Sequence, residues 1–238
     1  MRDPSAPLVS WVVCLVLAVV FGRASKAAAA RLATRAEVLS VLGAAARLED
    51  FERFPADTAT YYGFPSVLDS TTVRTQGQGP GLVRPGLTFR TEVSNLVWQG
   101  RNTAASFGSR VLAAAGGYPP STALNIDLAP AARAVGVDVN PWQPQLVDVE
   151  VFGTDDTTLL DTVHLDATSG TAFFGYFDAR GIGRVRIVQS AGEEGMNPLA
   201  IDNLVVPEPG GAALLITLAA AWLLPGRRRR GPAATSAL

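Results

Sequence analysis

The sequence of 238 residues predicts an all-β fold, an antiparallel and jelly-roll-like β-sandwich with a short N-terminal helix. From residue 87 onward, short segments alternate apolar and polar residues, as strands with one buried face do. Clusters of turn residues separate these segments, with almost no helical periodicity between them. The first and last strand-like segments both suit a core, so we expect them to pair. This pairing favours a jelly roll over the alternative, an immunoglobulin-like sandwich.

A short helix should precede the strands. The segment 30–47 is rich in Ala, Leu and Arg, and Thr34 with Glu37 three residues later forms a capping-box pattern. Gly43 supplies the stop, because glycine readily adopts the backbone conformation that ends a helix. The following segment, 48–54, alternates as a strand does and ends before a proline.

Eight further strands are expected, at residues 87–93, 124–128, 135–139, 147–151, 158–165, 171–177, 184–188 and 200–206. Turns are expected at residues 153–156, 167–170, 178–183 and 192–198. Two stretches are irregular, 75–86 and 99–123. The second is either a long surface insertion or includes one more strand around Val111.

The N-terminus has the parts of a secretory signal peptide. Arg2 precedes the apolar run Leu8–Phe21, and small residues follow at 24–30. The run is shorter than the roughly 20 residues of a spanning helix, so we expect residues 1–27 to be removed, with a retained anchor as the alternative. The single cysteine, Cys14, lies in this run without the small preceding residue of a lipoprotein signal. The mature protein should therefore lack thiols and disulfides.

The C-terminus carries a second pattern. Pro207, Glu208 and Pro209 precede a charge-free apolar run that ends at Leu224. A basic cluster follows the run, made up of Arg227, Arg228, Arg229 and Arg230. A transmembrane helix over 210–226 is just long enough to cross a locally thinned bilayer. The arginines after it should stay on the cytoplasmic side, which places the body of the chain on the exported side.

This order of motif, short apolar helix, arginine cluster and chain end resembles the PEP-CTERM sorting signal, which marks proteins handled by exosortases in Gram-negative bacteria. The resemblance covers residues 206–230, and the tail 231–238 runs on longer than the pattern usually does. It implies export by the Sec machinery, cleavage by a membrane-embedded exosortase near Pro207–Pro209, and release or transfer at the cell surface. The alternative is a plain C-terminal anchor with a proline-rich hinge.

These segments divide the chain into five parts. They are a signal peptide at 1–27, a short helical lead-in at 28–47, a β-sandwich exported domain at 48–206, the sorting signal at 207–230 and a cytoplasmic tail at 231–238.

The exported body is acidic, although the whole chain has a formal net charge of −1. Residues 28–206 hold 13 arginines, no lysine and 19 acidic residues, a net charge of −6. A nucleic-acid partner is not expected, because phosphate contacts need a basic surface. An acidic surface favours solubility and attracts cations.

No catalytic set emerges from the sequence. His164 is the only histidine and lies in a strand-like run, where we expect an exposed or hydrogen-bonded side chain rather than a member of a triad. Histidine- and cysteine-based zinc sites lack ligands. A pair of carboxylates for glycoside hydrolysis has no local signature, since geometry alone decides such pairs. We therefore expect a protein that is not an enzyme and that needs no cofactor.

Calcium is the one ion that the residues favour. Asp50, Glu52, Asp202 and Asn203 should approach one another if the first and last strands pair, and they carry the oxygen ligands that calcium prefers. Other acids lie on turns, at Asp155, Asp156 and Asp178. None of them has EF-hand spacing. The alternative for 202–203 is local hydrogen bonding at a strand edge.

Aromatic residues suggest a glycan platform. Trp142 lies in a proline-bounded loop, and the further candidates are Tyr61, Tyr62, Trp98 and Tyr118. Stacking on sugars needs exposed rings, whereas a single Trp is more often packed against the protein.

The sequence thus predicts a non-enzymatic surface or extracellular-matrix protein, anchored in the inner membrane as a precursor and associated with exopolysaccharide. The alternative is a carbohydrate-binding module, and a secreted hydrolase comes third.

Overall fold

The computed structural model describes residues 29–53, 61–63, 66–73, 80–92, 95–100, 109–114, 122–141, 145–189 and 199–208. The helical elements are α2 (Arg35–Leu42) and the short 3-10 helix η1 (Gly43–Ala45). The strands are β1 (Ala30–Arg31), β2 (Ala46–Glu49), β3 (Tyr61–Gly63), β4 (Val67–Asp69), β5 (Leu87–Thr91), β6 (Leu96–Gln99), β7 (Val111–Ala114), β8 (Thr122–Pro141), β9 (Leu146–Phe152), β10 (Leu159–Asp166), β11 (Ala172–Gln189) and β12 (Leu199–Pro207).

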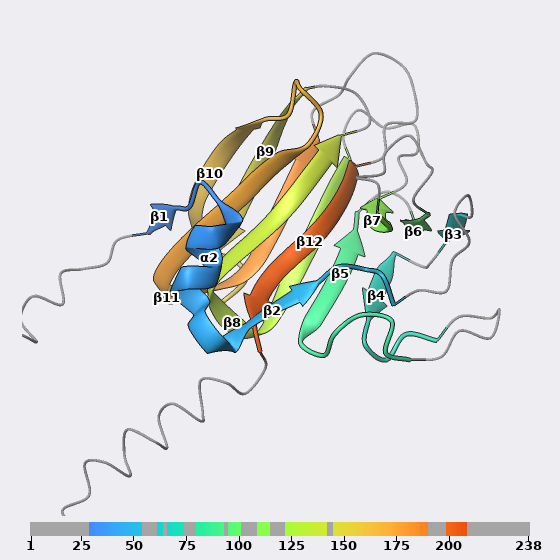
Figure 1. The fold of residues 1–238 in the computed structure, drawn as a ribbon, viewed down its shortest axis with the longest axis horizontal. Helices are drawn as coiled ribbons and strands as arrows, with labels where there is room; N and C mark the ends of the chain where they lie inside the picture. The colour runs from blue at the N-terminus through green and yellow to red at the C-terminus, as the bar shows by residue number, and fades with distance from the viewer. Residues whose placement is uncertain are drawn as a thin grey trace, which may run out of the picture.

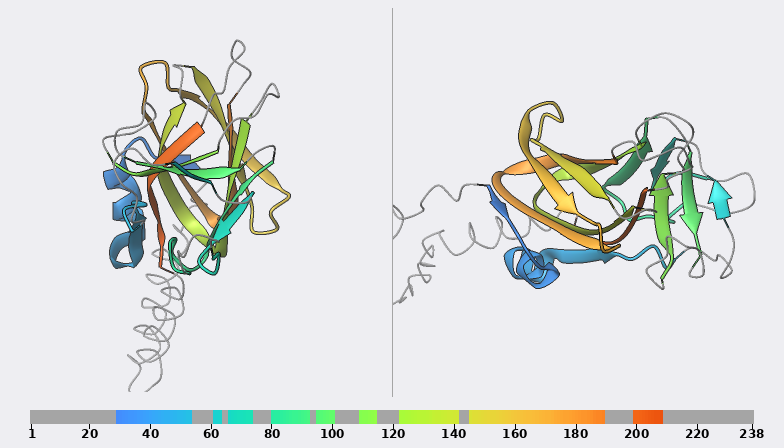
Figure 2. Two further views of the ribbon diagram at one scale, coloured as in Figure 1. Left: turned by 90° about the vertical axis from the view of Figure 1, so that its right-hand side faces the viewer. Right: turned by 90° about the horizontal axis from the view of Figure 1, so that it is seen from above.

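Every described strand pairing is antiparallel, and two long strands, β8 and β11, organise the sheet. The first half of β8 and the second half of β11 lie between β5 and β9, and β10 pairs with β9. The other halves of β8 and β11 lie between β12 and β1. The sheet therefore folds into two layers that share β8 and β11 (Figures 1 and 2).

Both long strands bend where they pass between the layers. The pairing of β11 with β8 shifts register between Phe177 and Ile182 and again before Arg184, as at a β-bulge. On β8 the bend contains Pro130, whose peptide bond with Ala129 is cis. Strands that bend at bulges can change layers without breaking their ladder, so the chain needs no separate turn here.

One continuous apolar core fills the space between the layers. The valines of β9 at 147, 149 and 151 and those of β8 at 135, 137 and 139 are all fully buried. Their period of two places these valines on the inner faces of the two layers, while the residues that alternate with them face outward, toward solvent on β9 and, at Ala134, toward α2 on β8. The sequence-level prediction of an all-β, antiparallel, sandwich-like fold is confirmed, whereas the jelly-roll connectivity stays a prediction.

The helix α2 covers the outside of the layer made by β12, β8 and β11 (Figure 1). Val38 is its buried residue, and it packs on Ala134 and Val205 in a second apolar cluster. Thr34 accepts a hydrogen bond from the Glu37 amide at 3.2 Å, and Glu37 accepts one from the Thr34 amide. The predicted capping box is thus confirmed, and Gly43 ends the helix with φ of 55° as expected.

The predicted pairing of the strand that follows the helix with the last strand is also confirmed, with different bounds. β2 pairs with β12 from Glu49 opposite Leu204 to Ala46 opposite Pro207. The strand does not extend over 48–54 as predicted, because Phe51 has a φ of 54° and the chain turns inward there. Its ring fills the core, in edge-on contact with Phe89 and Trp98, and core packing holds the backbone in this costly conformation.

Two other predictions need correction. Residues 178–183 were expected to be a turn between two strands, yet they belong to the continuous β11, and β8 likewise joins the strands expected at 124–128 and 135–139. Within the irregular stretch 75–86, Leu82 and Val83 are buried in the core. The strand considered around Val111 is present as β7.

None of the helices in the described ranges has the length and apolar character of a membrane span. The predicted signal peptide, the transmembrane helix at 210–226, the basic cluster and the tail lie outside the described residues.

Candidate functional site

The first candidate site is the end of β12, where the predicted processing motif begins. Pro207 is the last residue of the strand and lies opposite Ala46 of β2. The next amide, of Glu208, donates a hydrogen bond to the Ala45 carbonyl at 2.7 Å. The Glu208 carboxylate forms an ion pair with Arg47. We call these four contact residues, Ala45, Arg47, Pro207 and Glu208, the motif anchor.

Arg47 is itself oriented by the backbone. Its Nη1 donates to the Ala46 carbonyl at 2.8 Å and to the Ala44 carbonyl at 3.3 Å, at the point where η1 passes into β2. Carbonyls at the end of a helical segment are natural partners for a guanidinium. The remaining nitrogen, Nη2, is the one that meets Glu208.

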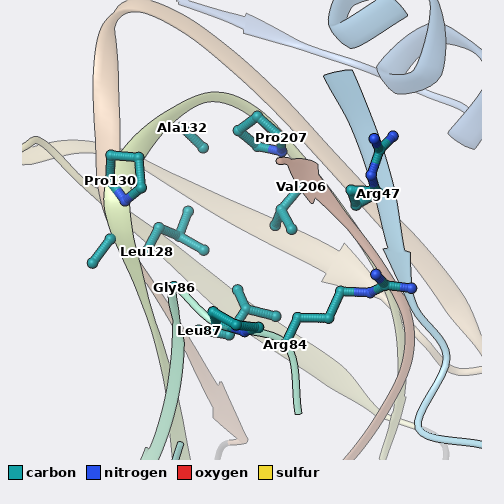
Figure 3. A pocket seen from close by; sticks show the side chains of 11 residues that line it. Arg47, Arg84, Gly86, Leu87, Leu128, Pro130, Ala132, Val206 and Pro207 are labelled. Atoms are coloured by element: carbon teal, nitrogen blue, oxygen red, sulfur yellow. The ribbon is translucent and has the colours of Figure 1, made fainter. Parts of the chain in front are cut away.

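A small cavity lies beside the motif anchor (Figure 3). Its wall is formed by Val206 and Pro207 of β12, the bend of β8 and the turn before β5, with Arg47 and Arg84 also contributing. Arg84 Nε donates to the Leu48 carbonyl at 2.9 Å, and its amide donates to the buried Glu49 carboxylate at 2.7 Å. Burial raises the pKa of Glu49, and the hydrogen bond from Arg84 opposes that rise.

The remaining residues of the predicted site lie elsewhere. Pro209 and the basic cluster at 227–230 fall outside the described residues, so only the first two residues of the motif have described contacts. Sequence reasoning missed Arg47 as a partner of Glu208. Nothing local marks it, because the contact depends on the pairing of β2 with β12 across 161 residues of sequence.

The second candidate site is a polar sheet face on the outside of the layer that holds β10, β9, β11, β8 and β5. Its members alternate along their strands with buried residues. They are Arg90, Glu92, Asn125, Asp127, Asp148, Glu150, His164, Arg184 and Arg186. Because they come from adjacent strands, their side chains form rows across the sheet.

The first row centres on Asp127. One carboxylate oxygen accepts from Arg184 Nε at 2.6 Å, and the other accepts from Arg90 Nε at 2.6 Å. The hydrogen bond with Asp127 raises the pKa of Arg184. Asp127 is largely buried beneath the two guanidinium groups, and Arg90 remains more than half exposed.

The second row centres on Arg186. Its Nε and Nη2 donate to the two oxygens of Glu92 at 2.8 and 3.0 Å, and its Nη1 donates to Glu150 at 2.8 Å. Asn125 adds a weaker bond to Glu92 at 3.3 Å. The Arg186 hydrogen bonds hold the pKa of Glu92 below its usual range, and Glu92 raises the pKa of Arg186.

His164 lies at the edge of the polar sheet face. Its side chain is 75% exposed, and its Nδ1 lies 2.6 Å from the Asp148 carboxylate. This is the exposed, hydrogen-bonded strand histidine that the sequence predicts. The face itself was not predicted, although polar residues with a period of two, at 148 and 150, at 125 and 127, and at 184 and 186, are a readable signal.

The residues considered for calcium are only partly brought together. Asp202 is 1% exposed and accepts hydrogen bonds from Ser109, from the Asn203 amide and from Asn203 Nδ2. Burial raises its pKa to about 6, with smaller contributions from the charges of Asp138 and Glu52. Glu52 is engaged by Arg110, whose amide donates at 3.0 Å.

These acids are satisfied by protein groups. Asp50 accepts from the Glu52 amide, and Asp155 accepts from two backbone amides and the Thr158 hydroxyl. Asp178 is paired with Arg180. Within the described ranges, no three His, Cys, Asp or Glu side chains are arranged to hold a metal ion. Local hydrogen bonding at 202–203, the alternative stated from the sequence, is what the structure shows.

The predicted aromatic platform is wrong for Trp98, which is fully buried in edge-on contact with Phe51 at 5.4 Å. Trp142 and Tyr118 lie outside the described residues. Tyr61 and Tyr62 are placed only by their backbone, in β3 opposite Gln99 and Trp98.

No family model and no curated protein sequence matches the chain. Solved structures of family 29 carbohydrate-binding modules are weakly similar. One has a TM-score of 0.35 and 10% identity, over 62% of this chain and 87% of that one. Another, from Piromyces equi, has a TM-score of 0.33 and 14% identity, over 63% and 91%. A variant complexed with mannohexaose has a TM-score of 0.34 and 14% identity, over 62% and 91%. Similarity of this size establishes neither a common fold nor a common ligand.

Proposed function

We propose that the chain is a non-enzymatic exported protein, whose β-sandwich is delivered to the cell surface or matrix after an exosortase cleaves near Pro207–Pro209. The observation that supports this best is the position of the motif. The last strand of the sandwich ends at Pro207, so the motif overlaps the end of the folded domain. Proline has no amide donor and is disfavoured inside a central strand, so the two prolines of the motif favour an extended chain that a protease can bind once the motif is released from the domain.

Replacing Pro207, Glu208 and Pro209 with alanine in the full chain tests this function. The substituted protein should remain in the membrane at its unprocessed mass, because the protease no longer finds its motif. The exposed Pro80 provides a matched control, since Pro80→Ala alters a surface proline outside the motif and outside the cavity beside it. Normal processing and distribution of the alanine variant would show that the motif does not direct sorting.

We propose polysaccharide binding through the polar sheet face as a second function of the same exported domain. Guanidinium and carboxylate groups that already hold one another in place keep further donors and acceptors for sugar hydroxyls. Three arginines face four acidic side chains there, at 92, 127, 148 and 150. This near balance of charge favours neutral glycans over polyanions.

Arg186→Lys is the direct test of this second function. Lysine retains the positive charge but cannot bridge Glu92 and Glu150 in one plane, so retention on a neutral polysaccharide should fall about tenfold. Arg133→Ala removes an exposed arginine from the bend of β8 and should bind as wild type does. Absence of wild-type retention on neutral and anionic polysaccharides alike would exclude the polar sheet face as a glycan site.

A further inference from the structure

The first two residues of the processing motif are part of the folded domain rather than of a free linker. Pro207 occupies the last position of the β2–β12 ladder, and the Glu208 amide is bonded to Ala45 beyond it. A protease that binds its substrate as an extended strand must take over these backbone groups. The contacts of the motif anchor therefore compete with binding of the motif by a protease.

The side chain of Glu208 is held as well. Its partner Arg47 is fixed in place by two backbone carbonyls, so little side-chain freedom is lost when the ion pair forms. Glu208 is the central residue of the motif and its side chain is 48% exposed, which means that the pair can open to solvent. An exposed ion pair of this kind is weak enough for a protease to displace. It is also strong enough to shift the equilibrium between the paired and the opened motif.

The packing around the anchor also favours local opening. Val206 is buried at the core, whereas the next residue, Pro207, is only half-buried and borders the cavity of Figure 3. Lifting Pro207 and Glu208 from β2 exposes little apolar surface as long as Val206 stays in place. Ends of ladders with few buried contacts open at low cost, without unfolding of the domain.

We propose that the sandwich shields its own processing motif. The contacts of the motif anchor hold Pro207 and Glu208 against β2. The exosortase acts on the fraction of molecules in which these contacts have opened. The inference rests on the proposed sorting function. It adds a regulatory contact, the ion pair between Glu208 and Arg47, and Arg47 lies far from the motif in sequence.

Pulse-chase measurement of the processing rate of the full chain in cells tests the proposal. Arg47→Ala should be processed about two- to fivefold faster than wild type, because it removes an ion pair of the exposed class. Arg47→Glu should be faster still, since it repels Glu208, while Arg47→Lys should lie between wild type and Arg47→Ala, because it keeps the charge but not the bridging guanidinium. Arg133→Ala controls for loss of an exposed arginine, and resistance of the membrane-bound domain to added protease verifies folding.

The outcomes separate the two proposals. If the alanine variant of 207–209 is unprocessed and Arg47→Ala is accelerated, both proposals hold. Unchanged or slower processing of the folded Arg47→Ala variant would contradict the proposal that the sandwich shields its motif, and would leave the proposed sorting function intact. Normal processing of the 207–209 variant would instead overturn the sorting function on which the shielding rests.

Discussion

Asp202 illustrates how burial at one residue sets a property of the whole domain. Its carboxyl group is almost completely removed from water and lies close to the charges of Asp138 and Glu52. The neighbouring Asn203 has a φ of 50° and donates from Nδ2 to both Asp202 and Asp138, at the point where the β12–β8 ladder shifts register. Hydrogen bonds stabilise the carboxylate but do not fully compensate for desolvation.

The pH dependence of stability should follow from this pKa. A carboxyl whose pKa rises to about 6 on folding binds its proton more tightly in the folded state. The free energy of unfolding should therefore fall as pH rises from about 4 to about 7, by up to about 3 kcal/mol from this group. The raised pKa of Glu49 acts in the same direction.

Asp202→Asn should reduce this slope, because an amide does not titrate and still accepts a hydrogen bond. Thermal midpoints measured at several pH values between 4 and 7 provide the comparison. Asp161→Asn, which changes a half-exposed acid paired with Arg31, should retain the wild-type slope. An identical pH dependence in wild type and Asp202→Asn would show that folding does not raise the pKa of Asp202.

At the scale of elements, local patterns predicted most strands but not the bends within them. Turn-forming residues at 178–183 do bend the chain, yet hydrogen bonding to β8 continues across the bend. A single sequence does not reveal whether a bent segment stays paired, because that depends on the partner strand. The same reason explains Phe51, whose positive φ follows from core packing rather than from its own preference.

The candidate sites divide in a similar way. The motif at 207–209 is contiguous, so its position could be predicted, and the pairing of the first and last strands brought β2 beside it. The Arg47 contact and the rows of the polar sheet face required strand register, which the sequence does not specify. Trp98 was wrongly considered for a glycan platform, because a tryptophan in a sequence can be a core residue as readily as an exposed one.

The strand β1 should depend on a glycine of β11. A Cβ atom at Gly175 would lie 2.5 Å from the Leu32 carbonyl oxygen, and the Leu32 amide donates to the Gly175 carbonyl at 2.9 Å. Gly175→Ala should therefore displace the segment beside β1 and lower the free energy of unfolding by about 1–3 kcal/mol. Chemical denaturation measures the loss.

Gly63→Ala is the matched control for this change, since a Cβ atom there meets nothing within 4 Å. It should alter stability by less than about 0.5 kcal/mol. Equal stability of the two variants would mean that the contact between β1 and β11 contributes nothing to the folded state.

For the whole molecule, the distribution of charge and apolar residues supports one account. The described domain carries its own core, its acidic side chains are largely paired with arginines or capped by amides, and its last strand ends at Pro207, the first residue of the predicted processing motif. The apolar segments at 8–21 and 212–224 lie outside this domain in sequence. We propose that they direct export and temporary anchoring.

Intact mass combined with cell fractionation of the native protein tests this account most directly. We predict a mature chain found outside the cytoplasm that lacks residues 1–27, including Cys14, and everything beyond the motif at 207–209. Recovery from the cytosol of a full-length chain of 24.9 kDa with both apolar segments intact would contradict it.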